Sequence, residues 1–285
     1  MKLSLTEKTA PFLLAAVIIA RATGYLFCKI CMEELGMFTL LALRSLTAVA
    51  LMLPFLWRRL QRISRREVLA GVVVGALFYA VMAAELFGLQ RTSTSTAAIL
   101  ENTAIVMVPF IAAIALGSKL KRKAIFCCAL ATLGVALLSY ESGALHFGLG
   151  EGAMLLAALF YACTIVATKR VTRGGDALLI GVVQIFTMGI LSLLSALAFE
   201  RIALPTRGDV WACLIYLTLV CTLFGFTLQP MAQSKCSAEK AGLFCAFNPV
   251  VSVILGVLVL NEPFGLLDLA GLILVLITIV LFAKE

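Results

Sequence analysis

The chain has 285 residues, of which 62% are hydrophobic and only 13% are charged, and its mean hydropathy is +1.10. Soluble domains carry about 25% charged residues. The composition therefore excludes a soluble globular protein and indicates a polytopic membrane protein. The net charge of +8 would suit nucleic acid, but the positive residues fall in short loops between apolar segments, so we exclude that partner.

The apolar segments predict ten membrane-spanning helices, since a helix needs roughly 20 mainly apolar residues to cross the hydrocarbon core. The first segment lacks a small-residue cleavage site after it, so we expect it to be a retained helix rather than a signal peptide. The connections are too short for a soluble domain. We place the spans at residues 11–32, 37–57, 68–90, 95–116, 124–140, 148–168, 178–199, 210–230, 238–259 and 266–283.

Lysine and arginine predict the orientation. Of the 23 such residues, seventeen fall in one set of loops, three in the opposite set and three within spans. Because positively charged loops stay in the cytoplasm, both termini are expected there, which requires an even number of spans. The opposite loops are acidic: Glu33, Glu34, Glu141, Glu151, Glu200, Asp209, Glu262 and Asp268.

An internal repeat predicts two units, residues 1–143 and 144–285, of five spans each. Five is odd, so the second unit would be inserted in the direction opposite to the first. Residues that correspond lie 140 to 144 positions apart: Lys29 and Lys169, Arg44 and Gln184, Glu85 and Gln229, Gly117-Ser118 and Asn261-Glu262.

Ionisable residues within the first five spans predict a polar site. They are Arg21, Lys29, Arg44, Glu85 and Glu101. Such residues are costly at bilayer depth and face protein or water. Three positive charges against two negative suit an anionic or zwitterionic ligand, and the two glutamates are candidate proton carriers. Alternatively, the charges pair with one another and only hold helices together, and Lys29 extends to the interface.

The second half offers neutral groups for the same site: Tyr161, Gln184, Gln229 and Asn248. Tyr161 is also compatible with simple packing of an aromatic ring. Asn248-Pro249 either opens span nine locally, as in broken transporter helices, or produces a mild kink.

Two stretches, Thr92–Leu120 and Leu223–Glu262, resemble the EamA branch of the drug/metabolite transporter superfamily, as do Lys29 and Arg44 in ALRSLTAVALMLP. The resemblance covers essentially the whole chain. It implies ten helices in two inverted repeats, and a central cavity lined by spans one to four and six to nine. It also implies a bacterial inner membrane and transport of small metabolites, often outward.

The chain departs from the family pattern at three positions. Asn248 replaces an acid before the proline of span nine, Ser118 replaces a glutamate after span four, and Arg21 replaces an aromatic residue. Arg21, together with the Glu85/Glu101 pair, therefore indicates a substrate or coupling ion particular to this member.

We therefore expect a secondary active transporter, in the outward direction, for a small polar or charged metabolite. Alternating access is the expected mechanism, and coupling to protons is left open. The alternatives are an uncoupled facilitator or exchanger, or a channel-like protein. An enzyme is not expected, because the single histidine, His146, has no catalytic constellation around it. No cofactor or metal is expected, the lipid bilayer is a partner, and a homodimer is left open.

Overall fold

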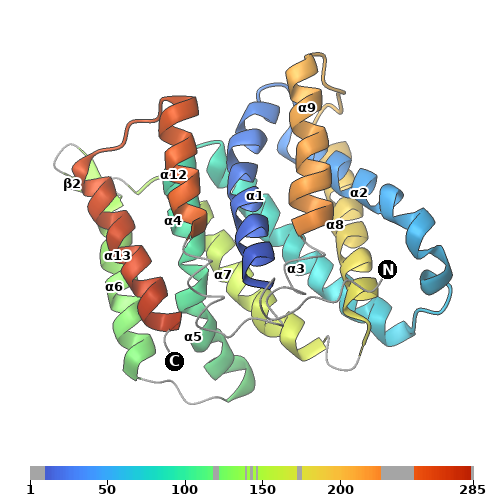
Figure 1. Ribbon diagram of the computed structural model, residues 1–285, viewed down its shortest axis with the longest axis horizontal. Helices are drawn as coiled ribbons and strands as arrows, with labels where there is room; N and C mark the ends of the chain where they lie inside the picture. Colours follow the sequence, from blue (N-terminus) through green and yellow to red (C-terminus); the bar gives the residue numbers. More distant parts are fainter. Residues whose placement is uncertain are drawn as a thin grey trace.

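The computed structural model describes residues 10–117, 122–138, 140–141, 144–145, 147–171, 175–225 and 247–283, and almost all of them are helical (Figure 1). A two-residue antiparallel pair, β1 (Tyr140–Glu141) and β2 (Ala144–Leu145), follows the first six helices. The helices are α1 (Ala10–Cys31), α2 (Met37–Leu60), α3 (Arg65–Leu89), α4 (Thr94–Asn102), α5 (Ala104–Leu116), α6 (Arg122–Leu138), α7 (Leu149–Val171), α8 (Ala177–Phe199), α9 (Gly208–Tyr216), the π-helix η1 (Leu217–Phe224), α12 (Phe247–Leu260) and α13 (Leu266–Ala283).

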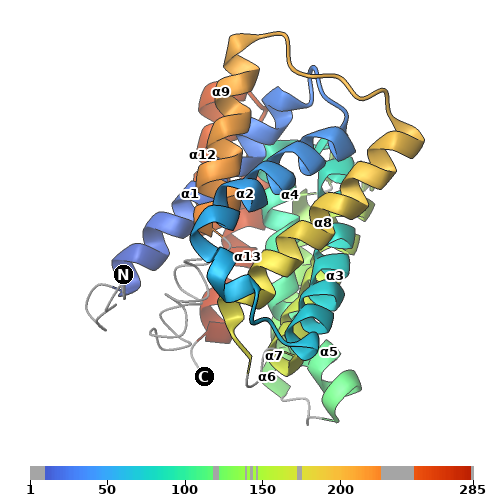
Figure 2. The ribbon, with the colours of Figure 1, turned by 90° about the vertical axis from the view of Figure 1, so that its right-hand side faces the viewer.

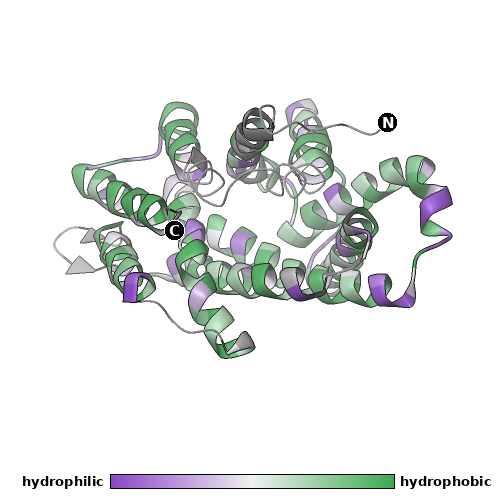
Figure 3. Ribbon diagram, turned by 60° about the horizontal axis from the view of Figure 1, so that its bottom comes forward, coloured by the Kyte–Doolittle hydropathy of each residue, from purple (hydrophilic) through white to green (hydrophobic). Residues whose placement is uncertain are grey.

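Five helical segments are long and apolar enough to cross a membrane: Met37–Leu60, Arg65–Leu89, Thr94–Ala115, Leu149–Thr168 and Leu178–Phe199. Three shorter apolar segments accompany them, Gly208–Phe224, Asn248–Leu260 and Leu266–Leu281. Figure 3 shows hydrophobic residues along most of each helix, with hydrophilic residues concentrated at helix ends and turns. Large apolar side chains such as Phe55 and Leu266 are almost fully exposed. The structure thus has the outer surface of a multi-pass membrane protein.

The predicted span 95–116 is interrupted at Thr103, which separates α4 from α5. The Asn102 amide donates to the Ala98 carbonyl at 2.7 Å, and the Thr103 hydroxyl donates to the Leu100 carbonyl at 2.6 Å. These side chains compete with the helical backbone for its acceptors. Pro109 within α5 lacks an amide hydrogen, so the Ile105 carbonyl, four residues earlier, loses its helical donor. The predicted span 95–116 is thus present as the segment Thr94–Ala115, with a local break at Thr103 that the sequence did not predict.

The π-helix η1 continues α9, within the predicted span 210–230. The Thr222 hydroxyl donates to the Leu217 carbonyl, five residues earlier, at 2.9 Å. This wider turn accompanies the change from α-helix to π-helix, a local feature that is frequent at functional sites. The later part of the span, from residue 226, lies outside the described residues.

Helices α2 and α8 pack against each other in opposite directions. At one end, Glu200, which follows α8, accepts hydrogen bonds from the amides of Phe38 and Thr39 in the first turn of α2. At the other end, Arg59 near the end of α2 lies 3.8 Å from the carboxylate of Asp176, which precedes α8. Figure 2 shows the two helices side by side.

Helices α6 and α13 also run antiparallel, and they pack together at one edge of the molecule (Figure 1). Gly134, near the end of α6, faces Gly271, near the start of α13. A Cβ atom on Gly134 would lie 2.9 Å from a methyl carbon of Val275 and 3.1 Å from the Gly271 carbonyl oxygen. The absence of side chains therefore lets the two backbones approach closely, as small residues commonly do in membrane helices.

The two ends of the molecule differ in charge. One, here called the acidic end, carries Glu34, Glu151, Glu200 and Glu262; the other, the basic end, carries the arginines at 58–66. Helix α1 begins and α13 ends toward the basic end, which is the lower end in Figure 1. The expected boundary between residues 143 and 144 falls at the turn between β1 and β2, where residue 143 lies outside the described residues.

Candidate functional site

A cavity of about 40 Å³ lies among the helices and is lined mainly by polar and sulfur-containing side chains. A cavity needs roughly 10–15 Å³ to admit one water molecule, so this one has room for a few. Its lining comes from α1, α2, α3, α4, η1 and α12: Arg21, Gly24, Tyr25, Cys28, Arg44, Met82, Glu85, Glu101, Cys221 and Asn248. Five of the nine residues predicted for the site therefore lie around one space.

Arg44 is the more deeply buried of the two arginines that line the cavity, since only 6% of the residue is exposed. Its two terminal nitrogens donate to Cys28 Sγ at 3.4 Å and to Met82 Sδ at 3.1 Å. Sulfur is a weak acceptor. The third guanidinium nitrogen, Nε, has no hydrogen-bond partner among the described residues. A buried donor without a partner costs about 1–3 kcal/mol, so Arg44 has unused capacity for an anionic group.

Two carboxylates and a second arginine complete the charged lining. Glu85 from α3 and Glu101 from α4 are both at least nine-tenths buried. Glu85 lies within electrostatic range of Arg44 and Arg21, and Glu101 within range of Arg21. Tyr161 on α7 is a further neighbour of Arg21. Two positive and two negative groups therefore face the cavity, and their charges sum to zero.

Asn248 contributes an uncharged acceptor from the first turn of α12. Its side-chain oxygen is buried and has no hydrogen-bond partner within the described ranges. Pro249 follows it in α12, and the carbonyl that a helical amide at this position would reach, that of residue 245, lies outside the described residues. Whether the preceding residues open span nine lies outside the described residues, as does Gln229.

Three predicted residues lie away from the cavity lining. Lys29 is at the acidic end, where its Nζ atom lies 2.9 Å from the Glu262 carboxylate. Gln184 on α8 is buried against α3, next to Gly75. Tyr161 packs edge-to-face on Phe78, with ring centroids 6.0 Å apart.

The sulfur-containing lining was missed by the sequence reading. Cys28 lies seven residues after Arg21, hence on the same face of α1, and Met82 lies three residues before Glu85 on α3. Cys221 lies in η1, where its thiol donates to the Ala20 carbonyl at 3.4 Å. Helical spacing from the charged residues would have found Cys28 and Met82; Cys221 depends on the tertiary fold. No cluster of metal-binding residues occurs in the part of the chain that the structure describes.

Comparison with known proteins connects the chain with transport. Residues 8–140 and 148–284 each match the model of the EamA-like transporter family. An uncharacterized transporter of Bacillus subtilis strain 168, YetK, is 25% identical over 275 residues, which cover 91% of this chain and 82% of that protein. An uncharacterized transporter of Archaeoglobus fulgidus is 23% identical over 270 residues, covering 94% of this chain and 83% of that protein.

A solved crystal structure shares the fold, with a TM-score of 0.69 over 97% of this chain and 96% of that chain. The two sequences are 18% identical, so the likeness extends to the fold alone.

Proposed function

Because the chain belongs to the EamA-like transporter family, we propose that it is a secondary carrier that moves a small polar or charged metabolite across the membrane by alternating access. The observation that carries the proposal is the buried cavity in which Arg44, with an unpartnered Nε, lies beside two buried carboxylates. Ionisable groups at membrane depth are costly and mark substrate or ion pathways. If Arg44 served only to hold helices together, we would expect its Nε atom to have a hydrogen-bond partner as well.

The charges of the cavity favour a zwitterionic ligand over a simple anion. Lys29 pairs with Glu262 outside the cavity, so the local sum of charges is zero rather than one positive. In the proposed complex, Arg44 receives the anionic group of the ligand, because its planar guanidinium binds a carboxylate through two parallel hydrogen bonds. Glu101 or Glu85 receives the cationic group, and Asn248 accepts a further hydrogen bond.

The proposed architecture is ten spans in two inverted repeats, residues 1–143 and 144–285. Two separate matches to one family model support the repeat. The antiparallel packing of α2 with α8, and of α6 with α13, supports the inversion, since each pair holds the same place in the two repeats. The positive loops support cytoplasmic termini. The proposed location is the inner membrane of a bacterial cell, and the proposed direction of transport is outward.

The experiment that tests the function compares metabolites inside and outside cells that contain the protein with those of cells that lack it. A carrier is expected to change the distribution of one solute class, which is then reconstituted in proteoliposomes and measured as flux. Counterflow of labelled solute against unlabelled solute distinguishes a carrier from a channel. No solute difference in the cells, together with no flux of zwitterionic or anionic candidates, would contradict the proposal.

Proton coupling is the finer form of the proposal, with Glu101 or Glu85 as the proton carrier. Both lie in the cavity, next to arginine. Flux with and without an imposed pH gradient separates coupled transport from the alternative, an uncoupled facilitator or exchanger. Equal flux in the two conditions would exclude coupling and leave the carrier function intact.

A further inference from the structure

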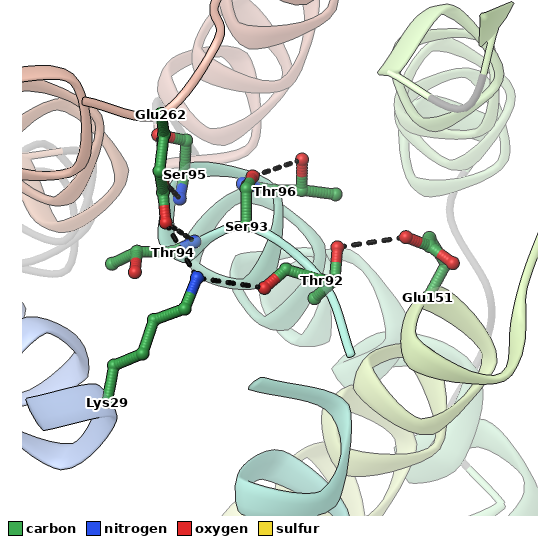
Figure 4. Close-up of polar contacts among 8 residues, drawn as sticks. All are labelled: Lys29, Thr92, Ser93, Thr94, Ser95, Thr96, Glu151 and Glu262. Carbon is green, nitrogen blue, oxygen red and sulfur yellow. Dashed lines mark hydrogen bonds and ion pairs between the residues drawn. The ribbon is translucent and has the colours of Figure 1, made fainter. Parts of the chain in front are cut away.

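The carboxylate of Glu262 joins helices that lie far apart in the sequence. Glu262 follows α12, and Figure 4 shows its carboxylate against the start of α4 and the end of α1. Oε1 accepts a hydrogen bond from the Thr94 amide at 2.6 Å and lies 2.9 Å from Lys29 Nζ. Oε2 accepts from the Ser95 amide at 3.2 Å and from its hydroxyl at 3.1 Å.

The neighbouring contacts extend this cluster to α7. Lys29 also donates to the Thr92 carbonyl at 3.3 Å, and the Thr92 hydroxyl donates to the Glu151 carboxylate at 2.9 Å. The side chain of Glu262 is only 7% exposed. A buried carboxylate that accepts several charge-assisted hydrogen bonds holds the helices that donate them strongly together.

The cluster lies directly beyond the cavity, toward the acidic end. Lys29 is the residue after Cys28, which lines the cavity. Thr94 precedes Glu101 by seven residues in the same helix, a rise of about 10 Å. The contacts of Glu262 therefore join α1, α4 and α12, three of the helices that line the cavity, on the side of the cavity toward the acidic end.

We propose that Glu262 and Lys29 form a gate, whose breakage is required before the cavity opens to the acidic end. The inference rests on the proposed carrier function, because alternating access requires a layer of contacts that is intact in one state and broken in the other. Glu262 acts here as a positioning residue: it fixes the start of α4, the helix that carries Glu101.

In the sequence, the position that the predicted repeat makes equivalent to Glu262 is Ser118. Within the described residues, positive φ angles occur at two positions, Gly117 (65°) and Asn261 (53°), and each directly follows a helix. These are the positions that the predicted repeat makes equivalent. Asn261 is followed by Glu262, whereas Gly117 is followed by Ser118, which has no carboxylate. We infer that the resting carrier is closed at the acidic end and opens its cavity more readily to the basic end.

The thiol of Cys28 provides a direct test, since it lines the cavity and is 2% exposed. A variant that keeps Cys28 as its only cysteine is treated with a membrane-impermeant methanethiosulfonate, in intact cells and in inside-out vesicles. Glu262→Gln is expected to raise the labelling rate at least about tenfold from the side of the acidic end and to lower it from the other side. A variant that keeps only Cys221, which also lines the cavity, provides a second reporter.

Matched variants separate gating from folding. Lys29→Met is expected to act in the same direction but less strongly, because Glu262 still caps α4, and Lys29→Arg should retain the labelling rates of the wild type. Asp268→Asn is the control, since Asp268 also lies at the acidic end but its Oδ2 accepts from Gly265, at the start of its own helix. Loss of structure would expose Cys28 from both sides, whereas a gate produces opposite changes.

Two results would overturn the gate. If Glu262→Gln leaves both labelling rates unchanged while wild-type protein transports its solute, the gate is wrong and the carrier function stands. If Cys28 is labelled from neither side in any variant and no solute flux is found, both inferences fail.

Discussion

The backbone amide of Thr39 donates to the Glu200 carboxylate at 2.8 Å, and its hydroxyl donates to the same oxygen at 2.8 Å, across 161 residues of sequence. This contact belongs to a group of carboxylates that accept from backbone amides at the starts of distant helices. The others are Glu34 with Thr206 and Arg207, Glu67 with Asp176, and Glu262 with Thr94 and Ser95. Negative charge is favourable at a helix start, where amides lack helical partners.

Removal of the Glu200 carboxylate is expected to destabilise the protein. Glu200→Ala leaves the amides of Phe38 and Thr39 without their acceptor. We expect a loss of about 1–2 kcal/mol, measured as a lower midpoint of thermal unfolding in detergent. Glu200→Gln keeps an acceptor oxygen and should lose less. An unchanged midpoint in Glu200→Ala would contradict the capping role.

A glycine next to this contact gives a second measurement of it. Gly36 precedes α2, and a Cβ atom there would overlap the Glu200 carboxylate. Gly36→Ala should therefore lower the unfolding midpoint in the wild type but much less in Glu200→Ala, because the neighbour that it meets is gone. A double-mutant cycle measures this coupling; additive effects of the two substitutions would show that the residues do not interact.

Close packing of α6 on α13 predicts that the interface tolerates no added methyl group. Gly134→Ala places a carbon 2.9 Å from Val275 and 3.1 Å from the Gly271 carbonyl oxygen. Overpacking of this kind costs about 1–3 kcal/mol, measured as a lower midpoint of thermal unfolding. Gly181→Ala is the matched control within α8, because nothing lies within 4 Å of its added carbon. Equal effects of the two substitutions would contradict the packing.

Substitution of Arg44 is expected to abolish transport of the solute identified by metabolite comparison. Arg44→Ala and Glu101→Gln should each lower flux in proteoliposomes at least about tenfold, with unchanged amounts of protein in the membrane. Arg44→Lys keeps the charge but loses the planar pair of donors, so it should also transport poorly.

Arg91→Ala is the control for these variants, since Arg91 is exposed and lies over the Phe87 ring outside the cavity. Its flux should stay within about twofold of the wild type. Normal flux in both Arg44→Ala and Glu101→Gln would contradict a role in transport and show that the two residues are purely structural.

The contacts of Glu262 predict a pH dependence of stability. Burial opposes its charged form, but the hydrogen bonds from the Thr94 amide, Lys29 and the Ser95 amide outweigh burial and hold its pKa below the ordinary value of 4.5. A lowered pKa contributes stability that is present above that value and is lost as the pH falls through the pKa of the folded state. The difference in unfolding midpoint between wild type and Glu262→Gln should therefore be constant at neutral pH and shrink below pH 4.5. A difference that stays constant down to pH 3 would contradict the assignment.

Hydrophobic length and charge in the sequence predict most of the membrane-spanning segments, because both follow directly from the cost of placing polar groups in hydrocarbon. The predicted spans 37–57, 68–90, 148–168 and 178–199 correspond to α2, α3, α7 and α8. The interruption at Thr103 was not predicted, because it depends on which carbonyls the side chains of Asn102 and Thr103 reach. The π-helix likewise depends on the bond from Thr222 to Leu217.

Charge alone identified Arg21, Arg44, Glu85 and Glu101, which the structure brings together in one cavity. It did not separate them from Lys29, which the sequence predicted at a similar depth but which the structure places outside the cavity lining. The difference lies in a partner that is 233 residues away, Glu262. Their roles in binding remain predictions, because the sequence and the geometry establish proximity and not occupancy by a solute.

The carboxylate caps have a consequence for which substitutions the chain can accept. The donors at Phe38, Thr94 and Asp176 are backbone amides, which every residue supplies except proline. A substitution at these positions other than proline therefore keeps the amide donor of the contact, whereas proline would remove it. The acceptor of each contact, in contrast, is a side-chain carboxylate, supplied by Glu34, Glu67, Glu200 or Glu262. Conservation of these contacts therefore requires the accepting residue rather than the donating one.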